Sequence, residues 1–236
     1  MSKRPDQNLV VGLDIGTSKV ACIVAEVNEG KLEIIGLGSA PSRGMKKGMV
    51  VNIESTTDSI RRAVEEAELM AGCEIHSVYT GIAGSHIRSL NSHGIVAIRD
   101  REVGRSDLER VIDAARAVAI PADQRVLHVL PQEFAVDDQR GVRDPIGMFG
   151  VRLEANVHIV TGAVTAVQNV CKSVQRADLE VADMVLEPLA SSRAVLTEDE
   201  KDMGVCLVDV GGGTSDVALF FQGSVRKTAV IGVGGQ

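Results

Sequence analysis

Two short segments that lie far apart in the sequence each join an aspartate to a turn of glycine and hydroxyl residues. One runs from Val11 to Ser18 (VGLDIGTS) and the other from Leu207 to Ser215 (LVDVGGGTS). In both, an apolar run that reads as a strand ends near an Asp, and Gly, Thr and Ser then lead into a second apolar run. This internal echo predicts two related half-folds that face each other.

The chemistry that these turns suit is phosphate binding. Glycine lets the backbone approach a ligand closely, and successive N–H groups of a turn can surround an anion. Asp14 and Asp209 would repel phosphate unless a divalent cation lay between them, and Mg²⁺ binds carboxylates, waters and phosphate oxygens together. We therefore expect a Mg²⁺-nucleotide between two lobes, with both aspartates holding the metal through water. The expected phosphate-binding residues are Gly16, Thr17, Ser18, Lys19, Gly211, Gly212, Gly213, Thr214 and Ser215.

A purely structural role for the two turns is less favoured. A single Asp-x-Gly-Thr is common in ordinary turns, but three consecutive glycines cost conformational entropy that a simple chain reversal does not require. The sequence contains no G-x-x-x-x-G-K-[ST] loop, and no G-x-G-x-x-G follows the first apolar run. The P-loop and dinucleotide-binding motifs are therefore excluded.

Strands and helices must hold these turns in place, and the apolar pattern predicts both. The run from Leu9 to Leu13 is continuously apolar, so we expect its strand to be buried on both faces. A helix is expected from Ser55 to Ala71, capped by Ser55 or Thr56 and ended by Gly72. Further strands are expected at 20–27, 32–38, 77–82, 181–185, 205–210, 217–221 and 224–231, helices at 165–176 and 187–196, and a polar loop at 197–202.

The stretch from Gly84 to Thr161 is richer in His, Arg and Asp than its surroundings. Ser106 to Glu109 reads as a capping box, and the helix that it starts has an apolar face that extends to Ala119. Strands are expected near 95–98, 126–130 and 153–160. We interpret this stretch as a small inserted α+β subdomain.

Composition excludes several other classes of protein. Hydrophobic residues make up 44% and charged residues 24% of the sequence, as in ordinary globular proteins. A net charge of −7 and only 2% aromatic residues argue against nucleic acid as a partner. The four Cys and five His lack disulfide or zinc spacing. No signal peptide is visible before Leu9 and no apolar run could span a membrane, so we expect a cytoplasmic location.

The motifs resemble those of the actin/Hsp70/sugar-kinase superfamily. Asp14 to Lys19 matches its first phosphate motif, Asp209 to Asp216 its second, and Glu187 to Ala194 (EPLASSRA) its first connecting helix. The resemblance implies ATP and Mg as cofactors and Asp14, Glu187 and Asp209 as candidate catalytic residues, with Glu187 near the hydrolytic water or the Mg²⁺ shell. Glu187-Pro188 could equally be a plain helix start, because Pro is favoured in the first turn.

Within that superfamily, the chain is similar to the bacterial cell-division family FtsA along essentially its whole length. The similar stretches are 11–19, 44–53, 79–84, 128–134 and 144–153. The last two lie in the inserted stretch. The family also carries an inserted subdomain, which is called subdomain 1C. The implied fold class is α/β, an actin-like (RNase H-like) ATPase lobe with an inserted α+β subdomain and the truncated start of a second lobe.

The resemblance implies a scaffold with at most weak ATPase activity. FtsA proteins bind ATP, form actin-like filaments, link FtsZ to the inner face of the cytoplasmic membrane at the septum, and recruit later divisome proteins through 1C. The implied divisions are the first part of subdomain 1A (1–84), subdomain 1C (85–161), the second part of 1A with the connecting helix (162–202), and the start of subdomain 2A (203–236).

The resemblance also implies that three family features are not among these 236 residues: the adenosine-binding glycine pair, subdomain 2B with its FtsZ-peptide site, and the amphipathic membrane tail. We therefore expect this piece to bind nucleotide weakly or not at all, and to associate through a strand edge that its last hairpins expose. A small-molecule kinase or a chaperone-type ATPase of the same superfold are the alternatives, because fold alone does not separate them. The 1C-like insert favours the cell-division scaffold.

Overall fold

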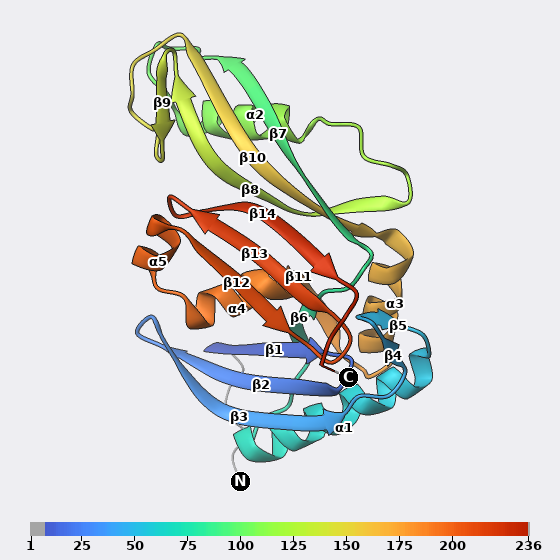
Figure 1. The fold of residues 1–236 in the computed structure, drawn as a ribbon. Coiled ribbons are helices and arrows are strands. Elements are labelled where there is room, and N and C mark those ends of the chain that lie inside the picture. The colour runs from blue at the N-terminus through green and yellow to red at the C-terminus, as the bar shows by residue number, and fades with distance from the viewer. Residues whose placement is uncertain (1–7, 236) are drawn as a thin grey trace.

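Three large sheets, one two-stranded sheet and five helices make up the part of the chain that the structure, a computed structural model, describes, residues 8–235. Residues 1–7, where no signal peptide is expected, and Gln236 lie outside the described residues. A five-stranded sheet lies at one end, a four-stranded sheet at the other, and a three-stranded sheet between them (Figure 1). None of the helices in 8–235 has the length and apolar content needed to cross a membrane.

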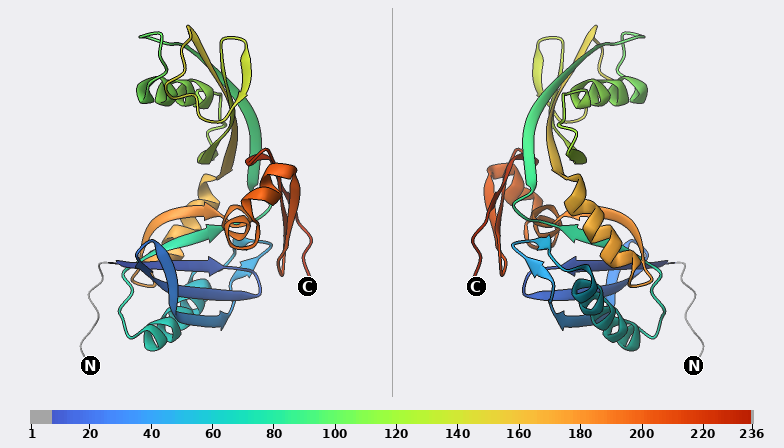
Figure 2. Two further views of the ribbon diagram at one scale, coloured as in Figure 1. Left: turned by 90° about the vertical axis from the view of Figure 1, so that its left-hand side faces the viewer. Right: turned by 90° about the vertical axis from the view of Figure 1, so that its right-hand side faces the viewer.

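The five-stranded sheet has the strand order β11-β6-β1-β2-β3. Its first three strands in sequence form an antiparallel meander, β6 pairs with β1 in parallel, and β11 pairs with β6 in parallel. Helices α1 and α3 cover one face, as Figure 2 shows. The elements are β1 (Leu9–Ile15), β2 (Lys19–Asn28), β3 (Lys31–Pro41), β6 (Ser77–Ile82), β11 (Glu180–Leu186), α1 (Ile53–Ala71) and α3 (Val164–Gln175).

Strand β3 packs against α1 through glycines that let two backbones approach closely. A Cβ on Gly38 would overlap with the carbonyl oxygen of Ala63 and lie 2.7 Å from the backbone nitrogen of Ala67. A Cβ on Gly36 would lie 2.7 Å from the carbonyl oxygen of Ala67. Because only glycine fits there, the helix can lie flat on the sheet and bury the aliphatic core beneath it.

The prediction that the first strand is buried on both faces is wrong. Burial alternates along β1: Leu13 is 2% exposed, whereas Val10 is 37% exposed. The helices cover only one face of this sheet, and the other face borders the cavity described below.

The predicted cap of the first helix is also wrong by a few residues. Helix α1 begins at Ile53, and the side chain of Asn52 caps it by accepting a 2.9 Å hydrogen bond from the Ser55 amide. Ser55 and Thr56 lie inside the helix. The predicted end is confirmed, because Gly72 adopts the left-handed conformation with φ 69°.

The four-stranded sheet, which we name the insert sheet, is antiparallel with the order β7-β10-β8-β9. Helix α2 packs on one of its faces over a separate apolar core. The elements are β7 (Ile87–Ala97), β8 (Gln124–Val136), β9 (Gln139–Val142), β10 (Arg152–Ala163) and α2 (Arg105–Arg116).

Several details of the predicted insert need correction. Its strands extend well beyond the expected segments, and β9 was not expected at all. Helix α2 begins at Arg105 after the N-cap Gly104, whose amide donates a 3.2 Å hydrogen bond to Asp107 Oδ2, so Ser106 is not the cap. The helix ends at Arg116, which leaves Ala119 beyond it. Long strands were missed because their polar faces break the apolar pattern on which the prediction depended.

The last sheet contains β12 (Val205–Val210), β13 (Ser215–Phe221) and β14 (Ser224–Ile231), in that order. Helix α4 (Glu187–Val195) joins the first sheet to it, followed by α5 (Glu198–Met203). The expected polar loop at 197–202 is wrong, because Thr197 and Glu200 form a capping box that starts α5. The Glu200 amide donates to Thr197 Oγ1 at 3.3 Å, and the Thr197 amide donates to Glu200 Oε2 at 2.8 Å.

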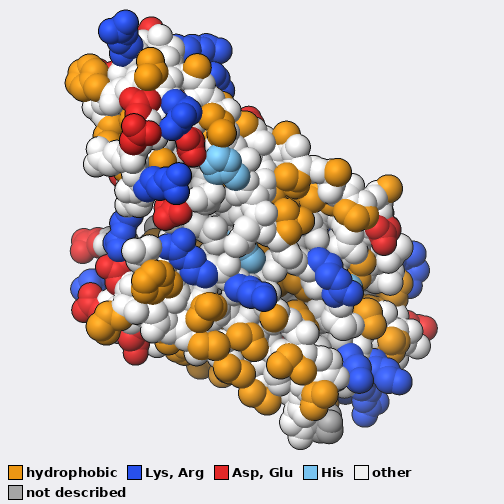
Figure 3. All heavy atoms as spheres, turned by 45° about the horizontal axis from the view of Figure 1, so that its top comes forward, with side chains coloured by type: hydrophobic (Ala, Val, Ile, Leu, Met, Phe, Trp, Pro, Cys, Tyr) orange, Lys and Arg blue, Asp and Glu red, His pale blue; other side chains and the backbone are white. Residues whose placement is uncertain are grey.

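The outer face of this last sheet is apolar and open. Val208, Val210, Leu219 and Phe221 are between 42% and 64% exposed. Exposed hydrophobic side chains are also frequent elsewhere on the surface, and many gather in the lower half of the view in Figure 3. The edge strand β14 packs on β7 and β8 of the insert sheet. The expected association through an exposed edge stays a prediction.

Candidate functional site

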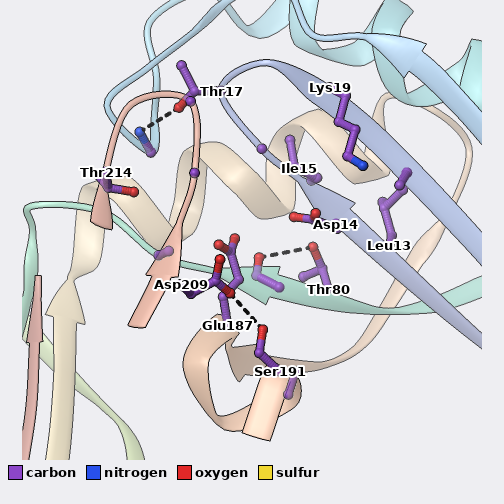
Figure 4. A pocket seen from close by; sticks show the side chains of 18 of the residues that line it. Leu13, Asp14, Ile15, Thr17, Lys19, Thr80, Glu187, Ser191, Asp209 and Thr214 are labelled. Atoms are coloured by element: carbon purple, nitrogen blue, oxygen red, sulfur yellow. Dashed lines mark hydrogen bonds between the residues drawn. The ribbon is translucent and has the colours of Figure 1, made fainter. Parts of the chain in front are cut away.

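A cavity of about 750 Å³ lies between the open face of the five-stranded sheet and the turn that joins β12 to β13 (Figure 4). The carboxylate side chains of Asp14, Glu187 and Asp209, from three separate elements, all border it. Of the expected binding residues, only Ser215 lies outside the lining; its hydroxyl instead donates a 2.8 Å hydrogen bond to the Val233 carbonyl. The others that line the cavity are Gly16, Thr17, Ser18, Lys19, Gly211, Gly212, Gly213 and Thr214.

The two glycine turns have the same backbone closure. The Gly16 amide donates to the Lys19 carbonyl at 3.1 Å, and the Gly211 amide donates to the Thr214 carbonyl at 2.9 Å. In each hairpin the aspartate precedes this glycine by two residues and sits on the first strand. The similarity seen in the sequence is therefore also a similarity of local structure.

The second turn lies directly against the first. A Cβ on Gly212 would overlap with the Ser18 hydroxyl, and a Cβ on Gly213 would lie 2.8 Å from Thr17 Oγ1. Glycine is required at both positions because of this close approach rather than because of a positive φ. The turns thereby bring their backbone N–H groups and hydroxyl groups to one end of the cavity.

The carboxylates raise one another's proton affinity. Burial, then the charges of Asp14, Asp216 and Asp209, raises the pKa of Glu187 well above its ordinary value. Burial and the neighbouring Asp209 also raise the pKa of Asp14, which Lys19 partly offsets. Burial raises the pKa of Asp216 as well. Such a concentration of acid groups is costly when all are ionised, and a bound cation relieves that cost.

Two of these aspartates are already oriented by hydroxyl groups. Asp209 Oδ2 accepts a 2.7 Å hydrogen bond from Ser191 Oγ, and Asp216 Oδ2 accepts one of 3.0 Å from Thr214 Oγ1. The buried Asp216 Oδ1 finds no hydrogen-bond partner among residues 8–235. In that same range, no three acidic, His or Cys side chains are grouped closely enough to hold a metal directly.

Three contributors to the site were missed at the level of sequence. Asp216 is the last residue of the second motif, so its spacing could have indicated it. His128, from β8 of the insert sheet, accepts a 3.0 Å hydrogen bond on Nε2 from the Leu186 amide and so holds the start of α4, where Glu187 lies. Gly48 lines the cavity from a turn between two short strands. For the latter two no local pattern gave a signal.

Solved structures share this architecture. A chain of the PilM-PilN type IV pilus biogenesis complex matches 96% of this chain and 62% of its own length, with a TM-score of 0.68 and 17% identity. The ethanolamine utilization protein EutJ from Carboxydothermus hydrogenoformans matches 99% and 55%, with a TM-score of 0.53 and 18% identity. The fold is that of the actin-like ATPases, and the predicted fold class is confirmed.

The sequence comparisons are more specific. The sequence profile described as "SHS2 domain inserted in FTSA" matches residues 84–161. Cell division protein FtsA of Pseudomonas aeruginosa is 66% identical over 96% of this chain, and that of Escherichia coli K12 is 48% identical over 98%. The chain belongs to the FtsA family. It spans about half the length of these curated relatives, 55% of each.

Proposed function

We propose that this chain carries the phosphate-binding part of an ATP site in an actin-like cell-division protein, with Mg²⁺-ATP as the ligand. The observation that carries the proposal is the meeting of two equivalent glycine turns and three carboxylates around one cavity. The turns supply N–H and hydroxyl donors to phosphate oxygens, and the carboxylates supply the negative charge that a hydrated Mg²⁺ requires.

Each predicted site residue has a role in this proposal. Asp14 and Asp209 would hold Mg²⁺ through its waters, one from each half of the site. Glu187, buried beside them, would orient a water molecule near the terminal phosphate, and burial and the neighbouring carboxylates raise its pKa and so favour its protonated form. Lys19 would neutralise phosphate charge. The remaining turn residues would bind phosphate oxygens, except Ser215, which donates its hydrogen bond to Val233, after β14.

The proposed subdivision assigns 1–84 and 162–202 to subdomain 1A, 85–161 to 1C and 203–236 to the start of 2A. Its support is that the strands of the five-stranded sheet come from 9–41, 77–82 and 180–186, those of the insert sheet from 87–163, and those of the last sheet from 205–231. The alternative of a single continuous lobe is not favoured, because the insert sheet has an apolar core of its own.

For the whole protein we propose the activities that its family name suggests. It would form filaments, link FtsZ to the inner face of the cell membrane at the division site, and recruit later divisome proteins through the inserted domain, with weak ATP hydrolysis at most. The support for this is family membership: the curated relatives are named for cell division.

The test of the ATP site is a thermal-shift titration of the chain with Mg²⁺-ATP into the millimolar range, repeated without Mg²⁺. We expect a metal-dependent rise in melting temperature, since a ligand that binds only the folded state stabilises it. Asp209→Asn should abolish that rise. The matched control Asp199→Asn, an exposed aspartate on α5, should leave it intact. A rise that persists in Asp209→Asn, or none in the unsubstituted chain, would refute the proposal.

A further inference from the structure

A third turn borders the cavity, between the short strands β4 (Met45–Lys46) and β5 (Met49–Val50). Its two residues, Lys47 and Gly48, have φ angles of 50° and 72°. Hairpin turns of this shape usually carry Asn or Asp before the Gly, and a side chain in the left-handed region costs about 1–2 kcal/mol. The turns at Glu29–Gly30 and Gln222–Gly223 have similar φ angles, so this conformation is ordinary for the fold, and the contacts of the Lys47–Gly48 turn are what set it apart.

The turn is bonded to the first glycine turn. The Gly48 amide donates a 3.1 Å hydrogen bond to Thr17 Oγ1 (Figure 4). A threonine hydroxyl has one proton and two lone pairs. Because its oxygen accepts from Gly48, the hydroxyl proton of Thr17 is left to donate to another acceptor. The bond thus orients Thr17 as a hydrogen-bond donor at the end of the cavity.

The same turn also contacts the second glycine turn. A Cβ on Gly213 would lie 3.0 Å from Lys47 Cα and 3.1 Å from the Lys47 nitrogen. Thr17 and Lys47 are therefore both neighbours of Gly213. Three turns, from distant parts of the sequence, meet at one point of the cavity wall.

The charge of the cavity is unfavourable to an anion by itself. Among the lining residues Asp14, Glu187 and Asp209 are acidic, and Lys19 is basic. A polyphosphate therefore needs positive charge beyond Lys19 and a metal ion. The side chain of Lys47 is exposed, and its flexible four-carbon stem can carry the ammonium group over the Gly213 turn that its own backbone touches.

We propose that the Lys47–Gly48 turn is the third wall of the phosphate site, in which Gly48 orients the Thr17 hydroxyl and Lys47 supplies a cation to the polyphosphate of the ligand. The inference rests on the proposed function, since it assigns further residues to the same site. Of the two neighbouring lysines Lys46 and Lys47, only Lys47 belongs to the site in this proposal.

The charge is tested with Lys47→Asn, because Asn suits the left-handed position and removes the ammonium group. Lys46→Asn is the matched control, with the same charge change one residue away on β4. The probes are Mg²⁺-ATP, inorganic Mg²⁺-tripolyphosphate and adenosine. We expect Lys47→Asn to weaken the binding of both polyphosphates about threefold to tenfold. Its affinity for adenosine and the melting temperature of the free protein should be unchanged. Lys46→Asn should leave all of these quantities unchanged.

Equal affinities in Lys47→Asn and the unsubstituted chain would overturn the cation role, as would an equal loss in Lys46→Asn. Binding of tripolyphosphate that depends on Lys47, without binding of Mg²⁺-ATP, would support this inference while refuting the proposed ATP site. Binding of neither would refute both.

The positioning role has a readout that needs no ligand. Hydrogen exchange at the Gly48 amide should accelerate in Thr17→Val, which lacks the accepting oxygen, and return toward the original rate in Thr17→Ser. Unchanged exchange in Thr17→Val would show that the Gly48–Thr17 bond does not hold this turn.

Discussion

The imidazole Nε2 of His158 lies 3.0 Å from the hydroxyl oxygen of Thr228 and joins two different sheets. His158 is on β10 of the insert sheet and is 1% exposed; Thr228 is on β14 and is 7% exposed. The other ring nitrogen of His158 lies 2.6 Å from Asn91 Oδ1, and the Ser89 hydroxyl donates to the Thr228 carbonyl at 3.1 Å. Through this junction the sheet that carries the second glycine turn is fastened to the insert sheet.

Thr228→Val should lower the free energy of unfolding by about 1–3 kcal/mol, because it leaves a buried ring nitrogen without its partner. Thr161→Val on β10 is the matched control. Thr161 is also buried, but its hydroxyl donates a 3.3 Å hydrogen bond within the insert sheet, to Gln124 Oε1. Gln124 is half-buried, so water can replace the lost hydroxyl as its hydrogen-bond donor. Urea unfolding monitored by circular dichroism measures both. If Thr161→Val lowers the free energy of unfolding as much as Thr228→Val does, the junction between the two sheets does not stabilise the protein in the way described.

The contribution of His158 to the stability of the protein should fall as the pH drops from about 6.5 to about 4. Burial lowers the pKa of His158 from 6.5 to about 4, so the unfolded chain takes up a proton in this window before the folded protein does. Unfolding is thereby favoured by about 3 kcal/mol at the lower end. His158→Gln cannot titrate and should lose less stability across the same window. Parallel pH profiles for the two proteins in denaturant titrations would argue against this assignment.

Glu187→Gln should stabilise the metal-free protein at neutral pH. A carboxyl group whose pKa is raised on folding destabilises the folded state as the pH rises above its ordinary value, and the pKa of Glu187 is raised by burial, Asp14, Asp216 and Asp209. We expect the melting temperature to rise by roughly 2–4 °C at pH 7, as ~1 kcal/mol produces in a chain of this size.

This gain should shrink as the pH approaches 4.5, because the glutamate of the unfolded chain then becomes protonated as well. Differential scanning fluorimetry across pH measures it. If Glu187→Gln raises the melting temperature equally at every pH, the removal of the Glu187 charge is not the cause of the increase.

Gly38→Ala should destabilise the protein by about 1–3 kcal/mol or more, since its methyl group would overlap with the α1 backbone at Ala63. Gly12→Ala is the matched control on the same sheet. A Cβ on Gly12 meets nothing within 4 Å, so its effect on unfolding should be near zero. Chemical denaturation of both variants measures the difference, and a Gly38→Ala protein as stable as the original would contradict the close packing of β3 on α1.

The sequence predictions are accurate where a feature depends on residues that are close together in the chain, and less accurate where it depends on distant residues. The helix at 53–71 and both glycine hairpins depend on neighbours in the chain, and the structure contains all of them. The helix at 198–203 was missed although its capping residues, Thr197 and Glu200, are local, because its polar composition resembles a loop. The exposed face of β1 could not be foreseen, because burial depends on which distant elements cover a strand.

The sequence by itself determined that Asp14 and Asp209 each stand two residues before a glycine turn, since strand and turn are set by adjacent residues and their backbone preferences. Only the tertiary structure decided that Glu187 lies beside both, that His128 holds the helix on which it sits, and that Gly48 closes the wall. These meetings join residues separated by tens to hundreds of positions. They depend on the packing of whole sheets and helices, which no local pattern encodes.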